Sequence, residues 1–157
     1  MQVLGIRAAP KEVRYAILEN DLGEIRFINA DSENRLHFPS RLENPEEKVY
    51  WLYQEFVRIL GLHPSVEYIV IKEPEFTRTK SSSKSGRSDR EIAYYNGIIL
   101  LVAAKCGKCV KIKRYKSIGT SNSQVLEFAE GKIGRTKHYW NRQIADAVAS
   151  AWSEISS

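Results

Sequence analysis

The most informative segment for the fold is QVLGIRAAPKEVRYAILEN, residues 2–20. It contains two apolar runs, Val3–Ile6 and Val13–Leu18, which flank a small loop that holds Pro10. Two apolar runs separated by a short connection predict two antiparallel strands that pair with each other. The first run is followed directly by Arg7, so a fixed positive charge is expected at the end of the first strand.

The segments after this hairpin alternate between strand and helix patterns. Residues 24–28 alternate polar and apolar side chains as a third antiparallel strand does, and residues 29–44 are polar and irregular. Asn44, followed by a proline and two glutamates, starts a helix that Gly61 ends. The remaining elements are predicted as a strand at residues 66–71, a helix over about residues 90–105, a strand at residues 109–115, a short helix near residues 123–130 and a final helix over about residues 139–155.

The predicted element order is β-β-β-α-β-α-β-α. Each helix between two strands forms a right-handed crossover, which makes the later strands parallel to the first. We therefore expect an α/β fold, a mixed five-stranded sheet with helices on both faces, in a single domain covering residues 1–157. The strand at Val3–Ile6 is expected in the centre, between its hairpin partner and the strand at residues 66–71.

The composition is that of a soluble globular protein, with 43% hydrophobic and 27% charged residues. The longest apolar run, Ile98–Ala104, is far shorter than the roughly 20 residues that a membrane span needs. No secretory signal pattern begins the chain, so we expect a cytoplasmic protein without a membrane partner. A net charge of +5 permits nucleic acid as a partner without requiring it.

The two cysteines, Cys106 and Cys109, form the motif CGKC. A zinc ribbon needs a second pair of ligands at similar spacing, and the three histidines do not supply one. A redox CxxC motif sits at a helix N-terminus, whereas this one follows a predicted helix. We therefore expect two reduced thiols at a helix-to-strand turn.

Four stretches stand out together: VLGIRAAPKEVRYAIL, IVIKEP, REIAYYNGIILLVAAKCGKCVKIKRY and NRQIADAVASAW. In their order along the chain and within the predicted element order, they resemble the RuvC branch of the ribonuclease H-like superfamily. This branch contains the Holliday junction resolvases and their relatives. The first resembles the opening of that family, and the second resembles its fourth strand, which ends in a catalytic Glu. The third resembles the helix and fifth strand that follow, and the fourth resembles the final helix. Glu73 and Asp146 give the resemblance its specificity.

The resemblance implies a nuclease site built from carboxylates. Nucleases of this fold use two divalent ions, Mg²⁺ or Mn²⁺, about 3.5–4 Å apart, and three or four acidic side chains hold them. By the resemblance, Glu73 and Asp146 are the catalytic residues, and in an active enzyme they are also metal ligands. At the other two positions, Arg7 stands in place of the first-strand Asp and Gln143 in place of a second Asp on the last helix.

Arg7 changes the electrostatics of such a site, because its charge lies where the cations would bind. Two unit charges about 4 Å apart repel by about 4 kcal/mol at an effective dielectric constant near 20. We therefore expect Arg7 to form a salt bridge with Glu73, Asp146 or both, as a built-in cation. In the alternative, a displaced carboxylate restores the metal site, and the candidates are Glu12, Glu19 and Glu75.

Each acidic match also has a purely structural interpretation. Glu73 can be a polar residue that closes a buried strand before Pro74. Asp146 lies four residues after Arg142 and can form an exposed helix ion pair worth about 0.3–0.5 kcal/mol. The alanines around Asp146 allow close approach of that helix to a sheet, which favours the interpretation from the family.

Clustered basic residues give a second, independent argument for nucleic acid. Residues 77–90, TRTKSSSKSGRSDR, are predicted to form a flexible surface loop, and the chain has no acid between residues 105 and 116. Cations on a polar, approachable surface suit contacts with phosphates. The predicted nucleic-acid-binding residues are Arg78, Lys80, Lys84, Arg87, Lys111 and Lys113, and the candidate stacking surfaces are Tyr94, Tyr95, Tyr115, Tyr139 and Trp140.

Three functions are open at this point. The first is a nucleic-acid-binding RuvC-like protein with a degenerate metal site, acting in DNA processing or as part of a larger complex. The second is an active Mg²⁺-dependent, structure-specific endonuclease with a displaced carboxylate ligand. The third is a protein-interaction subunit that uses the fold as a scaffold, because a fold alone does not determine function. The expected partner is nucleic acid, with DNA favoured, and protein partners or a homodimer are open.

Overall fold

The structure is a computed structural model that describes residues 1–75 and 83–157, with side chains of the second segment described from residue 86 on. Its strands are β1 (Gln2–Ala8), β2 (Glu12–Asp21), β3 (Glu24–Phe27), β4 (Arg35–His37), β5 (Val66–Lys72) and β6 (Cys109–Lys113). Its helices are α1 (Pro45–Leu62), α2 (Ser83–Lys105), α3 (Tyr115–Ile118), α4 (Val125–Lys132) and α5 (Arg142–Ile155). Within the described residues, no helix has the length and apolar character that crossing a membrane requires.

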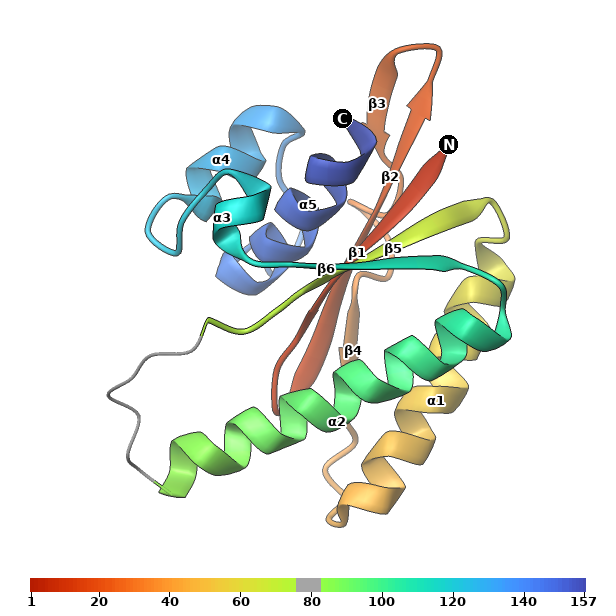
Figure 1. The fold of residues 1–157 in the computed structure, drawn as a ribbon, viewed down its shortest axis with the longest axis vertical. Helices are drawn as coiled ribbons and strands as arrows, with labels where there is room; N and C mark the ends of the chain where they lie inside the picture. Colours follow the sequence, from red (N-terminus) through yellow and green to blue (C-terminus); the bar gives the residue numbers. More distant parts are fainter. Residues whose placement is uncertain (76–82) are drawn as a thin grey trace.

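The sheet has the strand order β3-β2-β1-β5-β6, and β4 also pairs with β2 (Figure 1). β1 is antiparallel to β2 and parallel to β5, which is parallel to β6. The prediction of a mixed sheet, with Val3–Ile6 between its hairpin partner and residues 66–71, is therefore confirmed. The predicted five strands omit β4, which lies in the stretch expected to be irregular. Its three residues are too few for an alternating pattern to be visible.

Helix α2 begins at Ser83 and not near residue 90, so part of the predicted surface loop is wrong. The segment contains no proline, and the Arg87 Nε lies 3.2 Å from the Glu91 Oε1 one turn later. Pairs of opposite charge at this spacing support a helix. Lys84 and Arg87 therefore lie on the first turns of α2.

Helix α5 begins at Arg142 and not at residue 139, because two local features fix its start. Asn141 is the N-cap, and its Oδ1 accepts a hydrogen bond from the Ile144 backbone N–H at 3.2 Å. Tyr139 has a φ of 58°, in the left-handed region that a right-handed helix excludes. The predicted short helix corresponds to α4, and α3 is a further four-residue helix that the sequence pattern did not predict.

Helices cover both faces of the sheet, as predicted: α1 and α2 lie on one face, and α3, α4 and α5 lie on the other (Figure 1). The side beneath α1 and α2 contains a large cluster of aliphatic and aromatic side chains, which includes Leu4, Ile6, Phe56 and Ile99. On the other side, small residues of α5 pack against β1, β2 and β5.

Helix α5 approaches the sheet closely at Gly5 in β1. A Cβ atom at this position would lie 1.9 Å from the Ala147 carbonyl oxygen and 2.9 Å from the Ala151 backbone nitrogen. Real Cβ atoms do not tolerate such distances, so only glycine fits beneath the helix backbone. Because Asp146 directly precedes Ala147, this contact places Asp146 near the end of β1.

The cysteines of the CGKC motif lie in the connection between α2 and β6. Cys106 and Cys109 are both exposed, free thiols, as predicted. Between them, Gly107 has a φ of 69°, a backbone conformation that glycine adopts readily. The motif therefore forms a helix-to-strand turn at the end of the sheet opposite to Arg7.

Candidate functional site

Five basic residues, which we call the basic row, cross the sheet at one level. Arg7 of β1 pairs in register with Arg14 of β2, which pairs with Arg35 of β4. Lys72 of β5 pairs in register with Lys113 of β6. Ile6 pairs with Ile71, so Arg7 and Lys72 occupy the next positions on neighbouring strands. The row lies where the parallel strands β1, β5 and β6 end, beneath α5.

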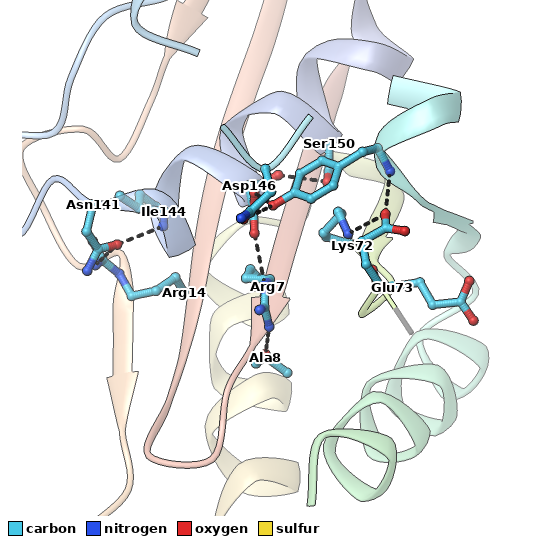
Figure 2. Close-up of polar contacts among 12 residues, drawn as sticks. Arg7, Ala8, Arg14, Lys72, Glu73, Asn141, Ile144, Asp146 and Ser150 are labelled. Atoms are coloured by element: carbon cyan, nitrogen blue, oxygen red, sulfur yellow. Dashed lines mark hydrogen bonds and ion pairs between the residues drawn. The ribbon is translucent and has the colours of Figure 1, made fainter. Parts of the chain in front are cut away.

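Arg7 and Asp146 form the central contact of this row. The Arg7 Nε donates a hydrogen bond to the Asp146 Oδ2 at 3.0 Å, which Figure 2 shows, and a second guanidinium nitrogen contacts the Ala8 carbonyl oxygen. Asp146 is buried, with 2% of its surface exposed. The alternative that Asp146 forms an exposed helix ion pair is therefore wrong, and the predicted salt bridge with Arg7 is present.

Tyr115 completes the surroundings of the Asp146 carboxylate. Its hydroxyl donates a hydrogen bond to the Asp146 Oδ1 at 2.7 Å, so both carboxylate oxygens have donors. Burial raises the pKa of Asp146 above its ordinary value, and the contacts with Tyr115, Arg7 and Lys72 oppose this rise. Asp146 is thus a buried carboxylate that depends on basic neighbours for its charge.

Lys72 is a second cation beside this carboxylate, and it was not among the predicted site residues. It is buried, and its Nζ lies 3.9 Å from the centre of the Tyr115 ring and 3.2 Å from the Glu75 Oε1. Burial lowers the pKa of Lys72, while Glu75 and Asp146 raise it. A lysine that ends an otherwise apolar buried strand, VEYIVIK, was the available sequence signal.

Glu73 does not join Arg7 and Asp146, so of the two partners expected for Arg7 it is Asp146 that forms the salt bridge. Its carboxylate accepts a hydrogen bond from the Arg114 Nε at 2.9 Å, and Figure 2 shows it turned away from Asp146. Glu73 follows β5 directly, and its backbone N–H bonds to the Lys113 carbonyl oxygen at 2.9 Å. The end of the strand therefore directs this side chain toward β6.

Comparison with known proteins connects this geometry to one fold. No protein-family model matches the sequence, and no curated protein matches it. RuvC from Thermus thermophilus, solved with a Holliday junction substrate, superposes with a TM-score of 0.78 at 17% sequence identity, over 99% of this chain and 92% of that chain. The chain has a RuvC-like ribonuclease H fold.

Two other solved structures share the RuvC-like fold. The yeast mitochondrial Holliday junction resolvase has a TM-score of 0.61 at 15% identity, over 96% of this chain and 77% of that chain. Fowlpox virus resolvase, in complex with Holliday junction DNA, has a TM-score of 0.52 at 13% identity, over 99% of this chain and 97% of that chain. At these identities the likeness establishes the fold.

The residues at the four motif positions of this RuvC-like fold do not fit a pair of divalent cations. Arg7 occupies one carboxylate oxygen of Asp146, Lys72 lies nearby, and Glu73 is paired with Arg114. No group of three or more His, Cys, Asp or Glu side chains that could hold a metal occurs in residues 1–75 and 83–157. Positive side chains thus surround the buried carboxylate at this site.

The candidates for a displaced carboxylate have different positions in the RuvC-like fold. Glu19 lies at the other end of β2, where it accepts hydrogen bonds from Gln2 at 3.0 Å and Arg26 at 2.8 Å. Glu12 is paired with Arg35. Glu75 accepts a hydrogen bond from the Tyr115 backbone N–H at 2.9 Å, so it alone of the three contacts the residues around Asp146.

Gln143, where the resemblance implies a second carboxylate on the helix, lies one turn before Asp146. It lines a surface pocket of about 520 Å³ together with residues 9–12 of the first hairpin and with Arg87, Ser88 and Glu91 of α2. Its Oε1 is buried and accepts no hydrogen bond from the described part of the chain. An amide here brings no negative charge to the site.

The predicted nucleic-acid-binding residues divide into three groups. Lys111 and Lys113 both pair with Glu154 of α5, with N–O distances of 2.8 Å and 3.2 Å, so they hold β6 against that helix. Arg87 is exposed beside its partner Glu91. Arg78 and Lys80 lie outside the described residues, as does the side chain of Lys84.

The candidate stacking residues also divide. Tyr95 is buried against Phe38 in the core beneath α1 and α2, so its assignment as a stacking surface is wrong. Tyr115 is partly buried by its contacts with Asp146 and Lys72. Tyr94 and Tyr139 are the exposed ones, with 45% and 66% of their surfaces accessible, and Trp140 is half-buried.

Proposed function

We propose that residues 1–157 form a nucleic-acid-binding domain in which the Arg7–Asp146 ion pair stands in place of a catalytic metal. The observation that carries this proposal is the 3.0 Å contact between the Arg7 Nε and the buried Asp146 carboxylate. Arginine stays charged at all physiological pH values, and its charge cannot be removed to make room for a metal. The domain binds nucleic acid without cutting it.

Electrostatics supports the loss of metal binding. A divalent ion beside Arg7 would meet at least the repulsion between two unit charges, about 4 kcal/mol at 4 Å and an effective dielectric constant near 20. Lys72 adds a second positive charge close to the same carboxylate. More than one carboxylate is needed to offset this repulsion, and of Glu73 and Asp146 only Asp146 lies at this point.

Binding to DNA is supported by charge and by the fold. The chain carries a net charge of +5 with exposed basic residues such as Arg87 at the start of α2. Two structures with the same fold were solved with Holliday junction DNA. Basic side chains on an approachable surface bind phosphates without reading sequence, and the two junction complexes make branched DNA the favoured class of partner.

One observation favours a second candidate function, a Mg²⁺-dependent endonuclease. Glu75 contacts both Lys72 and the Tyr115 backbone, within the group of residues around Asp146. On that alternative Glu75 is the displaced ligand that substitutes for the first-strand Asp. The present contacts of Glu75 with two donors argue against this role, because both donors would have to release it.

Salt-dependent binding tests the proposed function. Charge reversal of Lys80, Lys84 and Arg87 together is expected to weaken binding to a branched DNA and to lower the slope of log Kd against log salt by about 0.9 for each phosphate that these cations no longer neutralise. A matched control reverses Arg26, Lys105 and Lys108, which lie toward the other end of the sheet. Equal effects of the two triple variants would show that only net charge matters, and wild type that binds no DNA would refute the proposal.

A further inference from the structure

Tyr139 combines an exposed aromatic ring with an unusual backbone. Its φ of 58° lies in the left-handed region, which is uncommon for residues other than glycine and unfavourable for one with a bulky side chain. Tyr139 has 66% of its surface exposed, so burial of the residue does not compensate for this conformation. Such strain persists where the surrounding structure holds it, and it is concentrated at functional positions.

Arg14, the residue of the basic row that lies on β2, holds this backbone. Its side chain is completely buried, and one of its Nη atoms donates a hydrogen bond to the Tyr139 carbonyl oxygen at 2.9 Å. Its other donors go to the Asn34 carbonyl oxygen at 3.2 Å and the Asn34 Oδ1 at 2.9 Å. Within the described residues, no carboxylate forms an ion pair with Arg14. Burying a charge that has only neutral acceptors is costly in free energy. In return, these hydrogen bonds fix the loop that contains Asn34 and the loop that contains Tyr139.

The ring of Tyr139 is presented beside a second guanidinium. The Arg35 Cζ lies 4.7 Å from the centre of the ring, and the His138 ring lies 6.4 Å away at an angle of 60°. The loop is tied to residues 29–34 by the hydrogen bond from the Lys137 backbone N–H to the Ala30 carbonyl oxygen, at 3.1 Å. These elements line a pocket of about 170 Å³, formed by residues 30–35 and 137–139.

The chemistry of this pocket suits a flat, neutral ring. A tyrosine face with an adjacent guanidinium is the kind of surface on which unpaired bases stack. Asp31 and Glu33 also line the pocket, and their charges disfavour a phosphate inside it. Lys137 and His138 also line the pocket and are exposed, so they can contact the phosphates that flank a stacked base.

We propose that Tyr139 and Arg35 form a stacking site for one unpaired nucleobase, and that Arg14 is the positioning residue of this site. The inference rests on the proposed function, since it names the part of a bound nucleic acid that this surface recognises. Tyr139 lies just before α5, the helix that carries Asp146 on its second turn. A base displaced from a branch point would therefore stack at the start of the helix that covers the basic row.

Removing the ring is a clean test, because Arg14 bonds to the backbone of Tyr139 and not to its side chain. Two duplexes of the same sequence are compared, one fully paired and one with a single bulged 2-aminopurine. Affinity is measured by fluorescence anisotropy, and stacking by quenching of 2-aminopurine. Tyr139→Phe keeps the aromatic face and serves as the control, and thermal unfolding monitors the fold of each variant.

Wild type and Tyr139→Phe are expected to bind the bulged duplex more tightly than the paired one and to quench 2-aminopurine. Tyr139→Ala is expected to bind the bulged duplex about 5- to 150-fold more weakly, the range set by stacking of one base, with paired-duplex affinity unchanged. Equal affinity and quenching in wild type and Tyr139→Ala would overturn the stacking site while leaving duplex binding, and thus the proposed function, intact. Wild type that binds neither duplex would overturn both.

Discussion

The side of the sheet beneath α1 and α2 differs from the side beneath α5 in the residues that fill it. The first contains long apolar side chains, such as Leu4, Ile6 and Ile99, in one continuous cluster. The second combines a glycine and alanines with buried charges: Gly5 lies under Ala147, and the Arg7–Asp146 pair lies one step further along β1. Both sides share the strands β1, β2 and β5.

The two sides of the sheet therefore contribute differently: one stabilises the fold, and the other positions charged side chains. Burial of large apolar side chains is non-directional and stabilises the fold in proportion to area. Small residues bring backbones together at fixed distances, and they leave room at the strand ends for charged side chains. The side beneath α5 is therefore the one where a substitution changes geometry and electrostatics, and the site lies there.

The largest effect is expected for Gly5→Ala. The added methyl group would overlap the Ala147 carbonyl oxygen, so α5 must move away from β1, and we expect a loss of about 3 kcal/mol or more in the free energy of unfolding. Gly97→Ala in α2 is the matched control, since nothing lies within 4 Å of its added Cβ. Alanine there is expected to stabilise the helix by about 0.5–1 kcal/mol. Urea unfolding measures both, and equal effects would remove the contrast between the two sides.

The second largest effect is expected for Arg7→Met, because this substitution leaves the buried Asp146 carboxylate without its main ionic partner. We expect the free energy of unfolding to fall by about 2–3 kcal/mol, less than for a fully buried pair because Arg7 is partly exposed. Adding Asp146→Asn to the Arg7→Met variant should restore most of the lost free energy of unfolding. Arg87→Met, which removes the exposed partner of Glu91, is expected to lower the free energy of unfolding by only about 0.3–0.5 kcal/mol. Urea unfolding of the four chains tests this order, and similar losses for Arg7→Met and Arg87→Met would contradict it.

A smaller effect is expected in the pH dependence of stability. Burial raises the pKa of Asp146 in the folded protein, so the folded state binds a proton there more readily than the unfolded state. This contribution is fully present below the unfolded pKa and is lost as pH rises through the folded pKa. The stability of wild type relative to Asp146→Asn should therefore increase as pH falls from neutral to about 4. Urea titrations across this range would contradict the assignment if the difference were constant or reversed.

The smallest effect on stability is expected when a divalent metal ion is added to a variant that lacks Arg7. Arg7→Asp restores a carboxylate beside Asp146, and millimolar Mn²⁺ should stabilise this variant by about 1.4 kcal/mol, the value for an ion near ten times its Kd. Wild type should show no such shift in thermal unfolding. Arg87→Asp is the charge-matched control, because it adds the same carboxylate away from Asp146. A shift of the same size in all three chains would mean that Mn²⁺ binds elsewhere.

The sequence predicts the strand order well, because the strands carry long apolar runs and the helices between them restrict the connections. The pairing of Arg7 with Asp146 was also predictable, since the resemblance aligns both with one site. Lys72 and Arg14 were not, because their roles depend on strand register and on loops that are far away in the sequence. Arg14 reaches Tyr139 across 125 positions of the chain, and no local pattern reports such a contact.

Cleavage is the most direct test of the claim that an internal cation has replaced the metals. Junction, single-stranded and duplex DNA are incubated with Mg²⁺ or Mn²⁺ and with wild type, Glu73→Ala or Asp146→Asn. Wild type is expected to produce no more cleavage than either variant, because Arg7 holds the place of the metals. Metal-dependent cleavage by wild type that disappears in Glu73→Ala or Asp146→Asn would contradict it, and would identify an active nuclease with an unorthodox set of ligands.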